Sequence, residues 1–199
     1  MAELLLEILS EEIPARMQDR AAEDLASLVA ALLDEAGLAF EPTIRRFATP
    51  RRLAIVVDGL ALRQADRRVE RRGPRADAPE QARDGFLRSL AGVSFRLEER
   101  DDKKGKVLFA LVEEPGRSTA EILAAGLPEL LARFPWPKSM RWGEGEARWV
   151  RPLESILCLL DGAVVPFAFA GVESGAETVG HRFMASARFA VRGFDDYRT

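Results

Sequence analysis

The sequence predicts an α+β fold in which antiparallel sheets, built from hairpins, pack against a few helices. One observation is the dipeptide Asp161-Gly162, which stands between two apolar runs and is a strong signal of a tight hairpin. A second is the segment 93–114, in which residues 101–105 form a polar tip between two strand-like runs. Hairpins therefore outnumber strand–helix–strand units, and this favours antiparallel sheets.

A strand and a long helix open the chain. The mostly apolar residues 3–9 predict a short strand. A helix is predicted over residues 14–36, because one apolar stripe recurs at steps of three and four. The stripe comprises Met17, Ala21, Leu25, Leu28 and Leu32. Pro14 suits the first helical turn, and Gly37 suits its end.

Two strands and an arginine-rich segment follow. β-forming residues predict a strand over 53–62 and a second strand within 40–48, with Pro50 in the turn between them. Residues 63–75 contain six arginines against two acidic residues. A helix is predicted over about residues 79–91, before the hairpin described above.

The second half of the chain begins with a helical segment, residues 118–134. Pro128 is expected to split this segment or to start a second helix, because proline lacks the backbone N–H. The two apolar runs within 153–171 form the predicted Asp-Gly hairpin. Residues 178–186 and 187–193 predict two more short strands.

The last residues, 194–199, are typical of the start of a helix, since Asp195 and Asp196 stand where a first turn favours acids. We therefore expect a truncated piece of a longer protein. Two regions are predicted: an N-terminal α+β region, residues 1–115, and a second α+β region, residues 116–199, which holds the Asp-Gly hairpin and is cut before further domains.

Composition limits the possible functions. The chain has 199 residues and a formal net charge of −3, which argues against binding nucleic acid with the whole surface but permits a local cationic patch. No apolar run approaches the roughly 20 residues that a membrane span needs. A single cysteine, Cys158, excludes an internal disulfide, and we expect a cytoplasmic protein.

Motifs of a self-sufficient enzyme are absent from the sequence. One histidine, His181, and one cysteine do not make a structural zinc site. His181 lacks a nucleophile elbow of the G-x-S-x-G kind, and no phosphate-binding loop is present.

Three arginine-bearing segments remain as candidate contact sites. Residues 45–52 place four arginines around Pro50, and residues 67–75 add five more. The stretch "FPWPKSMRWG" sets Lys138 and Arg141 among aromatic rings, which could stack on bases. The alternative is that the arginines are solvated or paired with acids, each pair being worth under roughly 1 kcal/mol, and that the tryptophans are core residues.

Several uncommon stretches, in order, resemble the beta subunit of bacterial glycyl-tRNA synthetase over essentially the whole chain. They are "LLLEILSEEIPARMQ", "FATPRRLAIVVDGL", "RRGPR" with "GFLRSLAG", "WPKSMRWG", "RPLESILCLLDGAVVPF" and "SGAETVGHRF". Two departures stand out: Leu9 and Ser10 replace the family's Gly-Thr, and Glu154 stands where a histidine or an aromatic residue is expected.

The resemblance implies a non-catalytic role as the N-terminal part of this subunit. In the family, the alpha subunit binds ATP and glycine, so ATP and magnesium are expected there and no cofactor is expected in this chain. The beta subunit is needed for recognition of tRNA(Gly) and for the tetramer of two alpha and two beta chains. Domains downstream of this region, an HD-type domain and an anticodon-binding domain, are expected to be missing.

The candidate contacts to RNA or to the alpha subunit follow from these segments. They are Arg51, Arg52, Arg75, Lys138, Arg141, Trp142, His181 and Arg182. Trp136 and Trp142 are expected to brace Lys138 and Arg141 in a rigid, aromatic surface. Two other hypotheses stay open: a structural scaffold whose arginines bridge protein surfaces, and a stand-alone RNA-binding module with no role in aminoacylation.

Overall fold

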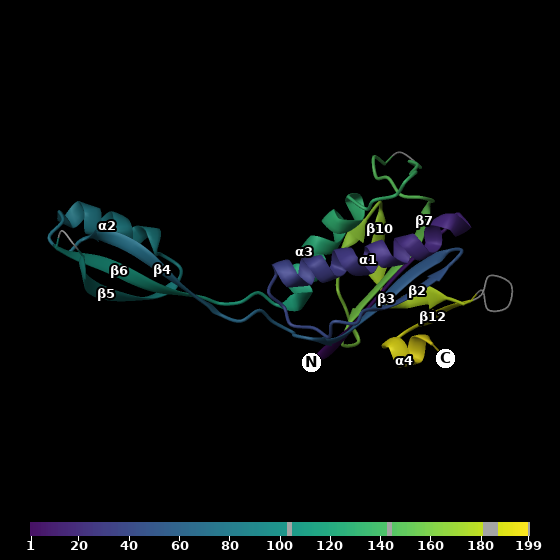
Figure 1. The fold of residues 1–199 in the computed structure, drawn as a ribbon, viewed down its shortest axis with the longest axis horizontal. Coiled ribbons are helices and arrows are strands. Elements are labelled where there is room, and N and C mark those ends of the chain that lie inside the picture. Colours follow the sequence, from purple (N-terminus) through teal and green to yellow (C-terminus); the bar gives the residue numbers. More distant parts are fainter. Residues whose placement is uncertain (103–104, 143–144, 181–186, 199) are drawn as a thin grey trace. The chain divides into compact units, whose positions relative to one another are not determined.

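The computed structural model describes residues 1–102, 105–142, 145–180 and 187–198 (Figure 1). Its contacts divide the chain into two compact units: unit 1 is Met1–Gln64 with Arg117–Thr199, and unit 2 is Ala65–Gly116. Unit 2 is therefore inserted between two halves of unit 1. The predicted boundary at 115/116 lies next to the second junction, whereas the first junction separates elements that the prediction placed in one region.

Unit 1 is built on a sheet with the strand order β2-β3-β1-β7-β10-β9, in which β8 also pairs with β7. The strands are β1 (Ala2–Ser10), β2 (Arg45–Thr49), β3 (Arg52–Leu60), β7 (Leu153–Leu160), β8 (Ala163–Val164), β9 (Ala168–Phe169) and β10 (Val172–Gly175). All described pairings are antiparallel except that of β10 with β7. The predicted α+β class with antiparallel sheets is confirmed.

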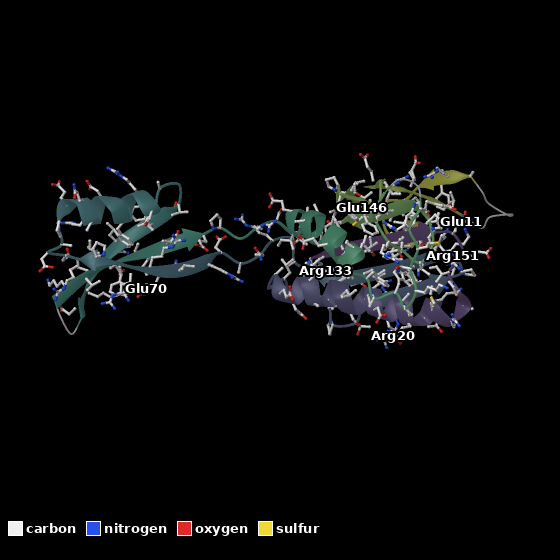
Figure 2. All side chains as sticks on the ribbon, turned by 90° about the horizontal axis from the view of Figure 1, so that it is seen from above. Glu11, Arg20, Glu70, Arg133, Glu146 and Arg151 are labelled. Atoms are coloured by element: carbon white, nitrogen blue, oxygen red, sulfur yellow. The ribbon has the colours of Figure 1, made fainter. Side chains whose placement is uncertain are left out.

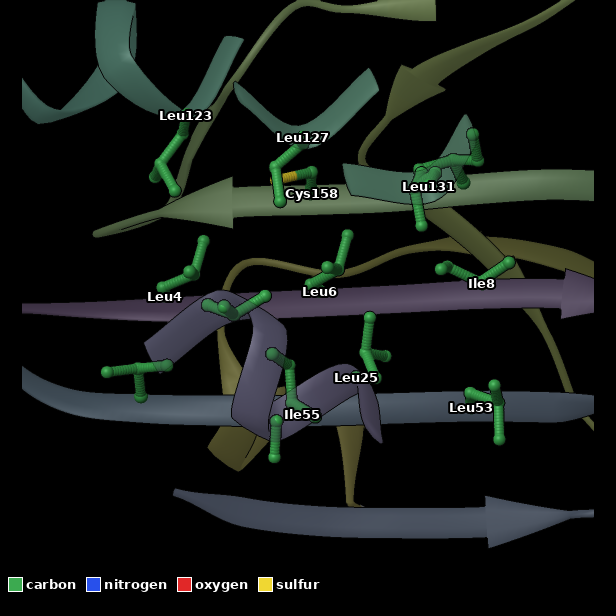
Figure 3. Packing of buried hydrophobic residues seen from close by; sticks show 14 of the residues in the cluster. Leu4, Leu6, Ile8, Leu25, Leu53, Ile55, Leu123, Leu127, Leu131 and Cys158 are labelled. Carbon is green, nitrogen blue, oxygen red and sulfur yellow. The ribbon is translucent and has the colours of Figure 1, made fainter. Parts of the chain in front are cut away.

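Helices α1 (Ala15–Glu35) and α3 (Thr119–Ala132) cover one face of this sheet. The side chains of β1 alternate, so Leu4, Leu6 and Ile8 point to this helical side (Figure 3). Leu5 points to the opposite face, where it lies in a second cluster with Val56 and other apolar residues. Because both faces are covered, the strand is an almost unbroken apolar run.

The long helix α1 confirms the prediction over 14–36, with one adjustment of its apolar stripe. Met17, Ala21 and Leu25 are buried as expected, but Leu28 and Leu32 only pack against the core from a half-buried position.

The expected break at Pro128 is wrong, because α3 runs without interruption from Thr119 to Ala132. Ser118 and Glu121 form a capping box that fixes its start. Buried leucines on both sides of the proline, Leu127 and Leu131 among them, hold the helix against the sheet. Tertiary packing therefore outweighs the local cost of the proline.

The Asp161-Gly162 hairpin is confirmed but short. Both turn residues have positive φ, 50° and 81°, as the favoured two-residue hairpin turn requires. Strand β8 then ends after two residues. Pro166 follows closely and cannot donate to a sheet ladder, which accounts for the early end of the strand.

The C-terminal part of unit 1 contains β11 (Glu177–Val179), β12 (Arg188–Ala190) and the short helix α4 (Phe194–Tyr197). β11 and β12 pair antiparallel, so both predicted strands exist in part, and most of the stretch 178–186 lies outside the described residues. The predicted helical turn at 194–199 is confirmed by α4.

Unit 2 is a three-stranded antiparallel sheet with one helix on a single face. Its elements are β4 (Arg67–Arg75), α2 (Glu80–Ser89), β5 (Ser94–Asp102) and β6 (Gly105–Glu114). The predicted hairpin and helix are confirmed. The arginine-rich segment, to which no element was assigned, forms the edge strand β4.

Candidate functional site

Residues 134–142, here called the tryptophan segment, are fixed to the core by an aromatic cluster. Trp149 is fully buried, and its ring centroid lies 4.9 Å from that of Phe134, 5.0 Å from that of Trp136 and 5.8 Å from that of Phe169. Trp142 is half-buried and also packs against the core. These rings therefore pack in the core, in agreement with the alternative that the tryptophans are core residues.

The backbone of the tryptophan segment is held by an isolated β-bridge between Met140 and Trp149. The Met140 N–H donates to the Trp149 carbonyl over 2.8 Å, and the reverse bond measures 3.2 Å. Arg148 Nε also donates to Ser139 Oγ over 3.2 Å. The Met140–Trp149 bridge thereby fixes the end of the tryptophan segment next to a buried ring.

Lys138 and Arg141 project from this fixed backbone into solvent. Within the part of the chain that the structure describes, neither side chain has an ion-pair partner among the acidic residues. The backbone of the segment and the Trp136 ring are held against the core. Bracing of Lys138 and Arg141 by the tryptophans stays a prediction, as does contact with RNA or a subunit at Lys138, Arg141 and Trp142.

The start of α1 extends the exposed positive charge beside the tryptophan segment. A small cavity of about 60 Å³ lies between them, lined by residues that include Arg16, Arg20 and Pro137. Arg20 projects from α1 (Figure 2) and pairs with Asp24 over 2.9 Å. Arg16, one turn earlier on the same helix, is also exposed. We use the name cationic surface for Arg16, Lys138, Arg141 and Arg148.

Arg51 lies in the turn between β2 and β3, and its charge is paired within the chain. Its guanidinium forms an ion pair with Glu154 and donates from Nε to the Ser10 carbonyl over 3.3 Å. Only 20% of the Arg51 side chain is exposed. Glu154, which stands where the resemblance led us to expect a histidine or an aromatic residue, is therefore the partner of a predicted contact residue.

Arg52 is paired with a fully buried carboxylate, Glu7. Arg52 Nε lies 3.3 Å from Glu7 Oε2, and Arg52 Nη2 donates to the Val179 carbonyl over 2.6 Å. Glu7 also accepts hydrogen bonds from the Thr178 hydroxyl, over 2.5 Å, and from the Tyr197 hydroxyl. We call Glu7, Arg52, Thr178 and Tyr197 the Glu7 network.

Burial raises the pKa of Tyr197 above its ordinary value, and the negative charge of Glu7 raises it further. The phenol therefore stays a hydrogen-bond donor to Glu7 throughout the neutral range. With two hydroxyl donors and one guanidinium, the buried carboxylate is well satisfied.

Arg75 belongs to unit 2, where it is exposed at the end of β4. The neighbouring arginines of this sheet are interleaved with glutamates. Arg68 lies 3.5 Å from Glu113 and Arg71 lies 3.3 Å from Glu114. Arg100 bonds to Glu98 and to Glu70, and these hydrogen bonds raise its pKa (Figure 2 labels Glu70).

The structure therefore groups the predicted contact residues only in part. Lys138, Arg141 and Trp142 share one segment, Arg51 and Arg52 are adjacent but enter different ion pairs, and Arg75 lies in the other unit. His181 and Arg182 fall outside the described residues.

Sequence reasoning missed the acidic partners, Glu7 and Glu154, as well as the Tyr197 hydroxyl. A signal for Glu7 was present, because it is the one charged residue between Leu4 and Leu9 in a strand whose neighbours are buried. A charge at such a position requires a partner.

Among the described residues, no group of three or more histidine, cysteine, aspartate or glutamate side chains is placed to hold a metal ion. None of the described helices has the length and apolar character to cross a membrane.

Comparison with known proteins gives a consistent result. The family model described as glycyl-tRNA synthetase beta subunit matches residues 4–199. The glycine–tRNA ligase beta subunit of Cereibacter sphaeroides is 58% identical over 202 residues, which cover 100% of this chain and 29% of that protein. The subunits of Paracoccus denitrificans and Phenylobacterium zucineum are 54% and 51% identical, each with 99% of this chain and 29% of the relative covered. The chain thus spans less than a third of the length of these relatives.

Proposed function

The chain belongs to the glycyl-tRNA synthetase beta subunit family, and from that premise we propose that it contributes to recognition of tRNA(Gly) and to assembly with the alpha subunit. In this proposal the working enzyme is a cytoplasmic tetramer of two alpha and two beta chains. ATP, magnesium and glycine bind to the alpha subunit, and this chain supplies contacts to RNA and protein instead of catalytic groups.

One observation carries the RNA contact: Lys138 and Arg141 are exposed, without an acidic partner among the described residues, on a backbone bonded to the buried Trp149. Because the backbone is already fixed, less conformational entropy is lost when its cationic side chains bind a ligand. Arg16 and Arg148 add positive charge nearby, so that the cationic surface matches the phosphate backbone of RNA.

Arg51 and Arg52 have a different role in this proposal. Their guanidinium groups already bind Glu154 and Glu7, and a phosphate would have to displace these carboxylates. We therefore assign them to the positioning of the β2–β3 turn. Arg75, Trp142, His181 and Arg182 stay candidate contacts to tRNA or to the alpha subunit.

The test is tRNA(Gly) binding by the assembled alpha–beta enzyme over a series of salt concentrations, with Lys138→Ala and Arg141→Ala as single variants. Each lost phosphate contact should reduce the slope of log affinity against log salt by about one. Arg46→Ala is the matched control, because Arg46 is an exposed arginine already paired with Glu23 over 3.2 Å. Its slope should equal that of the unchanged enzyme.

Two results would change the assignment. Loss of the tetramer on gel filtration, with an unchanged salt slope, would move Lys138 and Arg141 to the subunit interface. An unchanged slope with an intact tetramer would remove the cationic surface from tRNA recognition.

A second candidate role, protein bridging, is favoured by unit 2. Its arginines are interleaved with glutamates at 2.9–3.5 Å, so its sheet presents mixed charge instead of a positive field. Arginine is among the residues that are enriched in protein interfaces. Arg96, an exposed residue of β5, tests it: Arg96→Ala should weaken binding of the alpha subunit and leave the salt slope for tRNA unchanged.

A further inference from the structure

The face of the main sheet opposite α1 and α3 is covered by residues 188–198, which we call the C-terminal strap. Val191 and Phe194 of the strap are buried against Leu5, Val56, Leu157 and Leu159 of the sheet. In Figure 1 the strap is the yellow segment that includes β12 and α4.

The strap is tied to its surroundings by the pairing of β12 with β11, by the Arg45 guanidinium 4.3 Å from the centroid of the Phe194 ring, and by the following contacts. The Phe194 N–H donates to Glu3 Oε1 over 2.7 Å, and the Val191 N–H donates to the Ala176 carbonyl over 2.8 Å. The Phe194 ring stacks on Phe47 at a centroid distance of 5.2 Å. Phe47 itself is 40% exposed, so this edge of the strap is open to solvent.

Beneath the strap lies Glu7, which is fully buried and takes its donors from three elements. Arg52 comes from β3, Thr178 from β11 and Tyr197 from α4. Helix α4 is part of the strap, and β11 pairs with β12 of the strap.

We propose that Glu7 is the polar anchor of a detachable cover: the C-terminal strap leaves and re-covers this face of the sheet as one unit, while the sheet and its helices stay folded. In this proposal Glu7 controls a conformational change of the strap, a role that is separate from any contact with RNA.

Two features make release of the strap cheaper than unfolding of the sheet. The helical side of the sheet holds the larger core cluster, which includes Leu4, Leu6 and Cys158 and has no strap residue in it. On the strap side, opening returns Glu7 and Arg52 to water, and hydration offsets much of the lost ion pair. Opening of the strap exposes only this smaller apolar cluster and leaves the larger one buried, so it costs less than global unfolding.

The test is hydrogen–deuterium exchange of the 199-residue chain, measured on peptides that cover the strap and on peptides that cover β1, β3 and β7. In Glu7→Gln, the strap amides should exchange at least about tenfold faster, because hydrogen bonds to a charged group are lost or weakened. The amides of β1, β3 and β7 should keep their rates.

Tyr197→Phe is a second variant that keeps the ring and removes only the hydroxyl. It should speed exchange in the strap alone, by a smaller factor than Glu7→Gln, and it keeps the test open if Glu7→Gln does not fold. Glu11→Gln, which changes an exposed carboxylate just after β1, should alter neither region. Equal acceleration in strap and sheet, or no acceleration in either variant, would overturn the proposal.

Discussion

Replacing Arg52 by alanine should destabilise unit 1 far more than the loss of an ordinary surface arginine. Glu7 is 0% exposed and the Arg52 side chain is 20% exposed, so the variant leaves a buried carboxylate without its positive partner. Breaking a buried pair in this way costs about 3–5 kcal/mol. Because Thr178 and Tyr197 still donate to Glu7, we expect the lower end, about 3 kcal/mol.

The three tryptophans provide the assay, since Trp136, Trp142 and Trp149 all lie in unit 1 and report its unfolding without a signal from unit 2. Urea titrations followed by tryptophan fluorescence should give the loss of unfolding free energy. In a thermal melt the same change should lower Tm by about 6–12 °C for a chain of this size.

Arg46→Ala is the control, because Arg46 and Glu23 are 52% and 51% exposed and their pair is worth under about 1 kcal/mol. The double variant Glu7→Gln with Arg52→Ala should regain part of the stability, since it leaves no unpaired buried charge. If Arg52→Ala lost no more than Arg46→Ala, or if the double variant were weaker than Arg52→Ala, the buried ion pair would not be the cause.

Three further outcomes are expected. Pro128→Ala should raise the unfolding free energy of unit 1 by about 1–3 kcal/mol, because the proline lies inside the continuous helix α3; a loss of stability in the urea titration would show that its ring is needed for packing. Burial raises the pKa of Cys158 from 9.0 to about 12, so the native thiol should resist alkylation until denaturant is added, and rapid labelling of folded protein would contradict this burial. Because the unfolded thiol ionises near 9.0 and the folded thiol only near 12, the contribution of Cys158 to stability falls as pH rises through this window, and the fall should be smaller in Cys158→Val. Finally, the chain without an alpha subunit should show no glycine-dependent ATP–pyrophosphate exchange, and exchange above background in a pure sample would place an active site in this chain.

Much of the fold could be predicted from local patterns. The stripe of Met17, Ala21 and Leu25 identified α1, and the Asp161-Gly162 dipeptide identified the β7–β8 turn, because both signals depend only on neighbours along the chain. The prediction of a break at Pro128 was wrong because it also considered only local preference. That preference is outweighed by leucines of α3 that pack against a sheet distant in sequence.

The polar contacts were the least predictable part. Glu7 and Tyr197 are bonded although 190 positions separate them, and Arg51 and Glu154 are paired across 103 positions. No periodicity along the chain encodes such pairs. Exposure of Lys138 and Arg141 was expected from their charge, whereas burial of Trp149 beneath them required the three-dimensional packing.

The insertion of unit 2 bears on how the chain reaches its native state. The central strands β1 and β7 pair through residues such as Leu6 and Cys158, so most of the sequence must be spanned before the sheet can close. At the insertion point the chain returns to itself, since the Gln64 N–H donates to the Arg117 carbonyl over 3.0 Å and Arg63 bridges to Ser118. If the hairpins of unit 2 form early, they shorten the loop that separates the halves of unit 1 and lower the entropy lost on closure. Early folding of unit 2 would then speed the folding of a sheet to which unit 2 contributes no strand, compared with a chain in which these residues were still unfolded.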